Sequence, residues 1–302
     1  MKKIRVAVIG YGHIGKYVVK ALDDAGDLEL VGIVEQKRSL HDCRKQLPEI
    51  FFTNDIANIK GVDIAILCLP SVLVPDAAKM ILKSGVGTVD CFDRYGDDLL
   101  AVKKDLHKVS VANKVVSISA AGWDPGTDSI IRTIFEVAAP KGITYTNFGP
   151  GTSMGHTVAA KAVSGVKNAL SITIPEGFGF HKRCVYVECE DGVNLDEVEL
   201  NIKKDRYFFH DLTYIIESDD IDNLTDNGHS VVIERKGVAS QTGNQRFTFK
   251  STVTNPAVTA QIMVSSARAA MKQLPGNYLL PEIAPIDLLE GDDRDQLLRR
   301  LV

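Results

Sequence analysis

The stretch Ile4-Arg5-Val6-Ala7-Val8-Ile9-Gly10-Tyr11-Gly12-His13-Ile14-Gly15 decides the fold of this chain. An apolar run typical of buried parallel strands leads into a Gly-x-Gly-x-x-Gly motif, and a helical pattern follows. In dinucleotide-binding domains the first glycine allows a tight turn and the second lets the backbone approach a pyrophosphate. The third lets the helix pack closely on the strand. We therefore predict a cofactor-binding loop made of Gly10, Tyr11, Gly12, His13, Ile14 and Gly15.

The composition is typical of a globular chain of about two domains. The 302 residues are 45% hydrophobic and 25% charged, which is ordinary for a protein with a full core. The net charge of −4 gives no basic surface, so we expect no nucleic-acid partner. No apolar run approaches the roughly 20 residues that span a bilayer, and the N-terminus predicts a strand rather than a signal peptide. We expect a cytoplasmic protein with no membrane partner.

The cysteines predict neither disulfides nor a metal site. They are odd in number and show no Cys-x-x-Cys spacing: Cys43, Cys68, Cys91, Cys184 and Cys189. A disulfide framework or a zinc site is therefore not expected, and the predicted metal content is none.

Strand and helix patterns alternate over the first 120 residues. Further strands are predicted at 28–34, 62–69, 87–93 and 114–118, with an amphipathic helix over 76–83. This alternation is typical of an α/β fold, and we predict a doubly wound Rossmann-type domain. Cys68 and Pro70 come where one strand ends, at the sheet edge that lies beside the cofactor in such folds.

The turn after the second strand carries conflicting signals about the nucleotide. Glu35 there would hold a ribose 2′-hydroxyl and favour NAD. It is followed by Gln36, Lys37 and Arg38, whose charge and donors suit a 2′-phosphate. From these residues alone NAD and NADP remain equally open.

Two further loops at the carboxyl edge carry acidic residues. Asp90 and Asp93 could cap a helix predicted near Asp97, or one of them could meet a substrate. Asp124 could be a plain turn carboxylate, but it follows Trp123, the only tryptophan in the chain. A tryptophan beside a carboxylate at the ligand edge favours a site.

Composition then shifts to a strand-rich second domain. We predict residues 1–120, with 256–302 returning, as the dinucleotide-binding domain, and 121–255 as a substrate-binding and dimerisation domain of α+β type. Alternating strands near 182–188, 230–235 and 246–250 predict an open antiparallel sheet with one face covered by helices. A glycine-rich connection is predicted over 148–156. Asn255 is predicted to cap a long helix that starts with Pro256.

Several unusual motifs occur in one order along almost the whole chain. They are Gly10-Tyr11-Gly12-His13-Ile14-Gly15, Thr88-Val89-Asp90-Cys91-Phe92-Asp93, Ala121-Gly122-Trp123-Asp124-Pro125-Gly126, Phe148-Gly149-Pro150-Gly151, Met154-Gly155-His156, His181-Lys182-Arg183, Gly228-His229 and Asn255-Pro256. In this set the chain resembles the meso-diaminopimelate dehydrogenase family. The resemblance implies NADP-dependent oxidative deamination of meso-2,6-diaminopimelate at its D-centre, yielding L-2-amino-6-oxopimelate, ammonia and NADPH for lysine biosynthesis. It also implies a homodimer.

The resemblance further implies a division of the site residues. Asp93 and Asp124 would face the reacting D-amino-acid end and serve catalysis. The pocket there would be shaped by Trp123, Phe148, Met154 and Gly155. The distal L-amino-acid end would be held by Thr173, Arg183, His229 and Asn255. Because the substrate is zwitterionic at both ends, such a site needs carboxylates for ammonium groups and donors for carboxylates.

Some residues depart from the family pattern. Glu35 stands where a 2′-phosphate site favours a neutral or basic residue. Phe148 and Met154 replace the Trp and Gln of some relatives. An apolar pocket discriminates weakly, so we expect activity on other D-amino acids. The alternatives are another Rossmann-type oxidoreductase, such as a dihydrodipicolinate reductase or a sugar dehydrogenase, and a non-catalytic NADP(H)-sensing protein.

Overall fold

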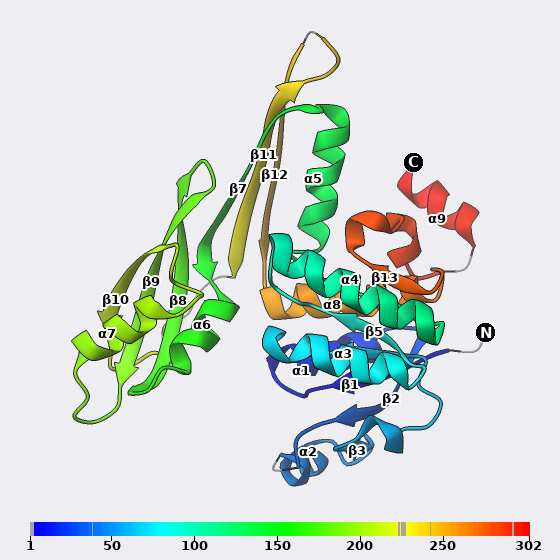
Figure 1. The fold of residues 1–302 in the computed structure, drawn as a ribbon, viewed down its shortest axis with the longest axis horizontal. Helices are drawn as coiled ribbons and strands as arrows, with labels where there is room; N and C mark the ends of the chain where they lie inside the picture. The colour runs from blue at the N-terminus through cyan, green and yellow to red at the C-terminus, as the bar shows by residue number, and fades with distance from the viewer. Residues whose placement is uncertain (1–2, 38, 223, 225–227, 242, 292) are drawn as a thin grey trace. The chain divides into compact units, whose positions relative to one another are not determined.

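The computed structural model describes residues 3–37, 39–222, 224, 228–241, 243–291 and 293–302. The chain divides into two compact units (Figure 1). Unit 1 comprises Met1–Ile130 and Pro256–Val302, and unit 2 comprises Ile131–Asn255. Residues 121–130 thus belong to unit 1, whereas the sequence predicts that the second domain begins at residue 121.

Unit 1 is built on a sheet of seven parallel strands. Their order across the sheet is β13-β6-β5-β4-β1-β2-β3. The strands are β1 (Ile4–Ile9), β2 (Leu28–Val34), β3 (Phe52–Thr53), β4 (Ile64–Leu67), β5 (Gly87–Asp90), β6 (Val116–Ile118) and β13 (Gly276–Tyr278). The order reverses between β1 and β4, which is the doubly wound pattern that the sequence predicts.

The helices of unit 1 are α1 (His13–Asp23), α2 (Leu40–Gln46), α3 (Val74–Lys83), α4 (Gly96–Asn113), α8 (Asn255–Ala270) and α9 (Arg294–Leu301). Figure 1 shows α3 and α4 side by side, and their buried residues, such as Ile81 and Leu106, join the core with Leu67 of β4. Because parallel crossovers are right-handed, the reversal of strand order places α1 on the opposite face. Among the described residues no helix is long and apolar enough to cross a membrane.

Unit 2 contains a six-stranded sheet in the order β10-β9-β8-β7-β11-β12. The strands are β7 (Lys141–Thr152), β8 (Val166–Gly177), β9 (Phe180–Cys189), β10 (Leu212–Glu217), β11 (His229–Val238) and β12 (Asn244–Val253). The accompanying helices are α5 (Thr127–Ala138), α6 (Met154–Lys161) and α7 (Leu195–Lys204). Val185 of β9, Ala160 of α6 and Ile202 of α7 share one buried cluster. In Figure 1, α5 runs beside β11 and β12, and Phe135 stacks on Phe247 at 5.4 Å between ring centroids.

Two features of unit 2 differ from the sequence analysis. The sheet is mixed rather than purely antiparallel, because β10 pairs with β9 in parallel. The stretch from Phe148 to Thr152 is the end of β7 and not a connection. Its glycines allow the strand to fit between its neighbours: a Cβ on Gly151 would lie 2.1 Å from the carbonyl oxygen of Gly228. A glycine-rich segment can therefore be strand where backbones approach closely.

Candidate functional site

In unit 1 the predicted site residues gather at one edge of the sheet. All seven strands are parallel, so their carboxyl ends meet at that edge. The glycine loop, residues 10–15, follows β1, and Glu35 follows β2. The loops with Asp93 and Asp124 follow β5 and β6. The fold thus brings the cofactor and catalytic candidates of unit 1 to a common edge.

The glycine loop has the shape of a diphosphate cradle. Gly10 has a φ of 94°, and a Cβ on Gly15 would lie 2.1 Å from the Gly10 carbonyl oxygen. A Cβ on Gly12, in contrast, would meet no atom within 4 Å. Gly12 is also the N-cap residue of α1, so the positive end of that helix faces the open space. These residues fit a bound dinucleotide.

Glu35 is held by the backbone on both of its carboxylate oxygens. The Tyr11 amide donates to one oxygen at 2.6 Å, and the Gln36 amide donates to the other at 2.7 Å. Glu35 therefore ties the end of β2 to the glycine loop. Gln36 and Lys37 are exposed beside it, whereas Arg38 lies outside the described residues.

The other loop side chains frame the cradle. The Tyr11 ring packs edge-on against Phe52 at 5.6 Å between centroids, and Lys16 lies 5.9 Å from the same ring. His13 is exposed at the start of α1, and Ile14 is partly buried. The backbone carbonyl of Cys68 packs against Gly10, at 2.6 Å from where a Cβ would stand. Burial raises the pKa of the Cys68 thiol.

Asp93 is paired with a residue that the sequence analysis missed. Pro70 is exposed and starts the short 3-10 helix Ser71–Leu73. The Ser71 hydroxyl donates to the Asp93 carboxylate, and the Asp93 amide donates to Ser71 Oγ at 3.2 Å. Its place directly after Pro70, at the end of β4, was the only sign of Ser71 in the sequence.

Asp90 is structural, and it organises both acidic loops. Its fully buried carboxylate accepts the amides of Phe92 at 3.0 Å and Ala120 at 3.1 Å, and the Ser119 hydroxyl at 3.0 Å. Burial raises its pKa, although these three bonds act in the opposite direction. Asp90 is therefore committed to these loops and does not cap α4, whose N-cap is Tyr95.

Trp123 and Asp124 lie in a tightly folded loop. Trp123 is buried, and its carbonyl accepts the Asp128 amide at 3.1 Å. The Tyr95 hydroxyl donates to the carbonyl of Asp124 at 3.1 Å. Asp124 is partly exposed. The loop thus fixes the backbone of Asp124 and leaves part of its side chain accessible.

In unit 2 the strand register places three of the predicted distal residues in one row. Thr173 of β8 pairs with Arg183 of β9 on one side and with Gly151 of β7 on the other. Gly151 in turn pairs with His229 of β11. Residues paired across neighbouring strands share a face. The guanidinium of the almost fully buried Arg183 donates from Nη1 to Thr173 Oγ1 at 2.7 Å.

The other predicted residues of unit 2 come from β7, α6 and the start of α8. The Phe148 ring lies 6.3 Å from the His229 ring and 6.2 Å from the His181 ring, between centroids. Met154 and Gly155 form the first turn of α6, soon after β7 ends. Asn255 opens α8, two residues beyond Val253, the partner of His229. The helix therefore includes the residue that was predicted as its cap.

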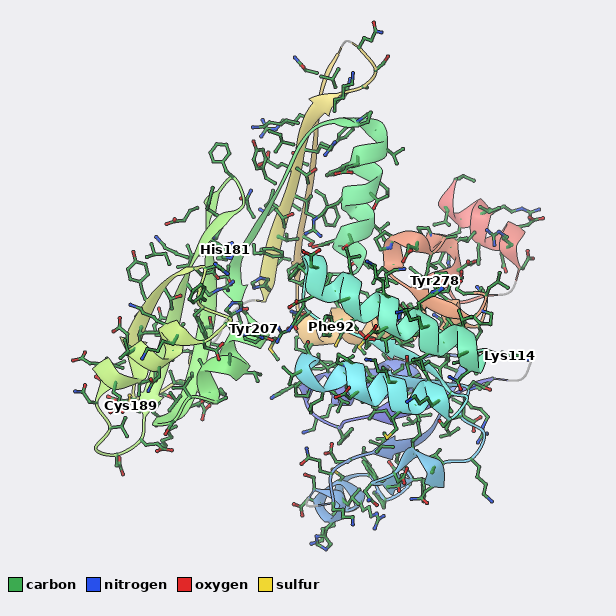
Figure 2. All side chains as sticks on the ribbon, in the orientation of Figure 1. Phe92, Lys114, His181, Cys189, Tyr207 and Tyr278 are labelled. Atoms are coloured by element: carbon green, nitrogen blue, oxygen red, sulfur yellow. The ribbon has the colours of Figure 1, made fainter. Side chains whose placement is uncertain are left out.

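An acidic partner of Arg183 was not predicted. Arg183 Nε donates to Asp211, and His181 Nε2 lies 3.1 Å from Arg183 Nη2 and 3.4 Å from Asp211 Oδ1 (His181 is labelled in Figure 2). Thr173, His181, Arg183 and Asp211 form what we term the Arg183 cluster. Burial raises the pKa of Asp211, but bonds from His181 and Arg183 and the charge of Arg183 lower it to about 2. Asp211 is therefore ionised at neutral pH.

His156 borders the cluster as a neutral imidazole. Its Nδ1 lies 2.8 Å from Ser153 Oγ, and its ring packs on Tyr207 and Phe208 at 5.3 and 5.2 Å. Burial and the Arg183 guanidinium lower the pKa of His156 to about 3, against the opposite effect of Asp211. The described residues contain no group of three or more His, Cys, Asp or Glu side chains that could hold a metal ion.

Comparison with known proteins shows the family to which the chain belongs. Residues 4–91 match the family model of the oxidoreductase family with an NAD-binding Rossmann fold, and residues 122–179 match the diaminopimelic acid dehydrogenase C-terminal domain. The meso-diaminopimelate D-dehydrogenase of Bacteroides fragilis is 49% identical over 302 residues, covering 100% of both chains. The chain belongs to the meso-diaminopimelate D-dehydrogenase family. It is thus an oxidoreductase that acts on CH–NH2 donors.

Solved structures agree with membership of the meso-diaminopimelate D-dehydrogenase family. The Corynebacterium glutamicum DAP dehydrogenase in complex with DAP matches with a TM-score of 0.88 at 25% identity, covering 100% of both chains. A dihydrodipicolinate reductase from Paenisporosarcina matches with a TM-score of only 0.53 at 15% identity, covering 93% of this chain and 100% of that one. The second likeness concerns the fold alone, so the reductase alternative of the sequence analysis is not supported.

Proposed function

We propose that the protein catalyses NADP-dependent oxidative deamination of meso-2,6-diaminopimelate at its D-centre. The products are L-2-amino-6-oxopimelate, ammonia and NADPH, a reaction that serves lysine biosynthesis. The observation that carries this proposal is the coexistence, in a chain of this family, of an open diphosphate cradle and a buried Arg183 in a row with Thr173 and His229. A guanidinium in such a row suits an amino-acid carboxylate.

The glycine loop would hold the cofactor. Gly12 leaves space for the diphosphate, and the N-terminus of α1 adds a favourable dipole. Lys37 is placed to attract a 2′-phosphate, and Arg38 follows it in the sequence. These features favour NADP. When bound, NADP+ supplies the hydride acceptor.

Asp124 and Asp93 would handle the proton of the reacting amine. Oxidation requires a neutral amine, because the nitrogen lone pair forms the carbon–nitrogen double bond as hydride leaves. Asp124, partly exposed in a fixed loop, accepts that proton directly or through water and passes it to solvent. As a carboxylate again, it then takes a proton from the water that adds to the carbon–nitrogen double bond. Asp93 is oriented by Ser71 and assists.

The distal end of the substrate would be held in unit 2. Arg183 binds its carboxylate, and Thr173, His229 and Asn255 add donors or acceptors. The two ends of the substrate are chemically identical and opposite in hand. Fixing the L-end therefore selects the D-centre for oxidation.

A direct spectrophotometric assay of the wild type and of an active-site variant tests this function. NADPH absorbance is followed with meso-diaminopimelate, with the L,L isomer and with NAD+ in place of NADP+. Asp124→Asn should abolish deamination and leave the dissociation constant of NADP+ unchanged, whereas Asp97→Asn, an exposed carboxylate on α4, serves as the matched control. Near-normal turnover of D124N would contradict the role of Asp124, and an inactive wild type would contradict the function.

We also propose relaxed specificity, a homodimer and a cytoplasmic location. Phe148 and Met154 present apolar atoms, so D-alanine, or pyruvate plus ammonia, should give measurable turnover. The homodimer follows from the family resemblance, with unit 2 as the dimerisation unit, and sedimentation at micromolar concentration tests it. The five cysteines are all free, which is typical of a reducing compartment.

A further inference from the structure

We propose that Asp211 receives the distal ammonium group of the substrate, so that Arg183 and Asp211 together recognise an intact L-amino-acid end. This inference rests on the proposed function and adds a specificity-determining residue to it. The chemical need is clear from the substrate. Its distal carbon carries an ammonium group as well as a carboxylate, and an ammonium removed from water requires an anionic or strongly accepting partner.

The predicted distal set lacks such an anion. Thr173, Arg183, His229 and Asn255 carry either no charge or a positive charge. Arg183 can neutralise the carboxylate, but nothing in this set can neutralise the ammonium. Within the Arg183 cluster, only Asp211 is acidic.

Topology places Asp211 on the same face as Arg183. β10 pairs with β9 in parallel, with Leu212 opposite Lys182 and Thr213 opposite Arg183. The residue before Leu212 therefore lies beside His181, which shares a face with Arg183 because side chains alternate along a strand. The contacts agree: Asp211 accepts from Arg183 Nε and lies 3.4 Å from His181 Nε2. Asp211 thus extends the row of distal residues.

Asp211 can accept another donor. Its side chain is 18% exposed, against 7% for Arg183, so it is the more accessible member of the pair. A carboxylate has about four lone-pair sites. The structure uses them for Arg183 and His181, while His156 Nε2 stands farther away at 3.8 Å. The remaining lone pairs of the Asp211 carboxylate can accept hydrogen bonds from an ammonium group.

Charge balance supports the same assignment. Arg183 and ionised Asp211 form a neutral pair, and His156 adds no charge at neutral pH. A zwitterionic end that binds across the pair leaves the net charge of the cluster unchanged and pairs each charge with its opposite. A distal end with a carboxylate alone would leave an excess negative charge in a largely desolvated place, which is costly.

The test separates recognition of the ammonium from orientation of Arg183. D-2-aminopimelate has the same D-centre and the same distal carboxylate as meso-diaminopimelate but no distal amine. We expect wild type to prefer meso-diaminopimelate in kcat/KM. Asp211→Asn should lower kcat/KM for meso-diaminopimelate by roughly 10- to 100-fold, the size of a lost charge-assisted hydrogen bond. For D-2-aminopimelate it should leave kcat/KM unchanged or raise it, because the variant lacks the negative charge that opposes a distal carboxylate without an ammonium group.

The controls and contrary outcomes are distinct. Asp191 is an exposed carboxylate in the turn after β9, and Asp191→Asn should leave kcat/KM unchanged for both substrates. An equal fall for both substrates would show that Asp211 only orients Arg183 and would overturn the inference, as would a wild type that does not distinguish them. If D211N does not fold, Asp211→Ser replaces it, and the wild-type comparison needs no variant. Absence of any NADP-dependent oxidation of meso-diaminopimelate by wild type would instead refute the proposed function.

Discussion

The glycine loop of unit 1 consists of backbone, whereas the Arg183 cluster of unit 2 consists of side chains. In the loop, Gly12 leaves space and the end of α1 supplies a dipole. In the cluster, Arg183 is fixed by Thr173 of β8, by Asp211 just before β10, and by His181 two residues earlier on its own strand. The loop suits a ligand part common to many cofactors. The cluster suits one particular arrangement of charges.

The largest effect is expected when a methyl group is added to the loop, in two separate variants that test its stability and its ligand space. Gly15→Ala places a Cβ 2.1 Å from the Gly10 carbonyl oxygen, and we expect it to lower the free energy of unfolding by about 3 kcal/mol. Gly12→Ala meets no protein atom, so it should keep its stability but lose affinity for NADP+. Thermal unfolding and titration with NADP+ measure the two effects. Equal stability of the two variants would contradict the structure.

Arg183→Lys tests whether the cluster depends on geometry as well as charge. Lysine keeps the positive charge but cannot contact Thr173, His181 and Asp211 at once. We expect kcat/KM for meso-diaminopimelate to fall by about 100-fold, with unchanged affinity for NADP+. Arg206→Lys, at an exposed position, is the matched control. If the variant weakened NADP+ binding instead, the assignment of Arg183 to the substrate would be wrong.

Acid should destabilise unit 2 through His156. Its folded-state pKa, about 3, lies below the ordinary value of 6.5, so between these values the unfolded chain binds more protons. Stability is complete above pH 6.5 and declines as the pH falls toward 3, by up to about 1.4 kcal/mol per pH unit. His156→Gln should flatten this dependence in denaturant unfolding followed from pH 7 to pH 5, whereas the exposed His41→Gln should not. Asp211, with its pKa lowered to about 2, adds a further loss below about pH 4.

The smallest expected effect concerns the nucleotide. Glu35→Gln removes the negative charge near the predicted 2′-phosphate site; its single oxygen can keep the bond to the Tyr11 amide or to the Gln36 amide, but not both. We expect the preference for NADP+ over NAD+ to rise about fivefold, which corresponds to roughly 1 kcal/mol of charge repulsion. Glu35→Ser removes the tether as well and should weaken both nucleotides. A lower NADP+ preference in Glu35→Gln would show that the charge does not oppose the 2′-phosphate.

The comparison also explains how far the sequence could predict the molecule. The cofactor loop is local, so six consecutive residues and the strand before them were enough to identify it. The Arg183 cluster depends on register between strands far apart in the chain. Thr173 and Arg183 were found through the family resemblance, but no local pattern around Asp211 shows that β10 pairs in parallel with β9.

Two other differences have the same origin. Residues from Phe148 to Thr152 look like a loop by composition, because the need for glycine comes from neighbouring backbones such as that of Gly228. Ser71 is an ordinary serine in the sequence, and its bond to Asp93 joins residues 22 positions apart. Asp90 was recognised as part of a motif, but its burial between two loops was not predicted.

The position of Asp90 has a consequence for changing the specificity of the enzyme. The buried Asp90 carboxylate accepts the backbone amides of both Phe92 and Ala120, so the loops that carry Asp93 and Asp124 move together as one rigid unit. An insertion that displaced the backbone of either loop would, through Asp90, also displace the other loop. In the row of unit 2, Arg183 donates directly to Thr173, so these two side chains depend on each other. New substrates are therefore best sought by exchanging Arg183 and Thr173 together, with the acidic loops left untouched.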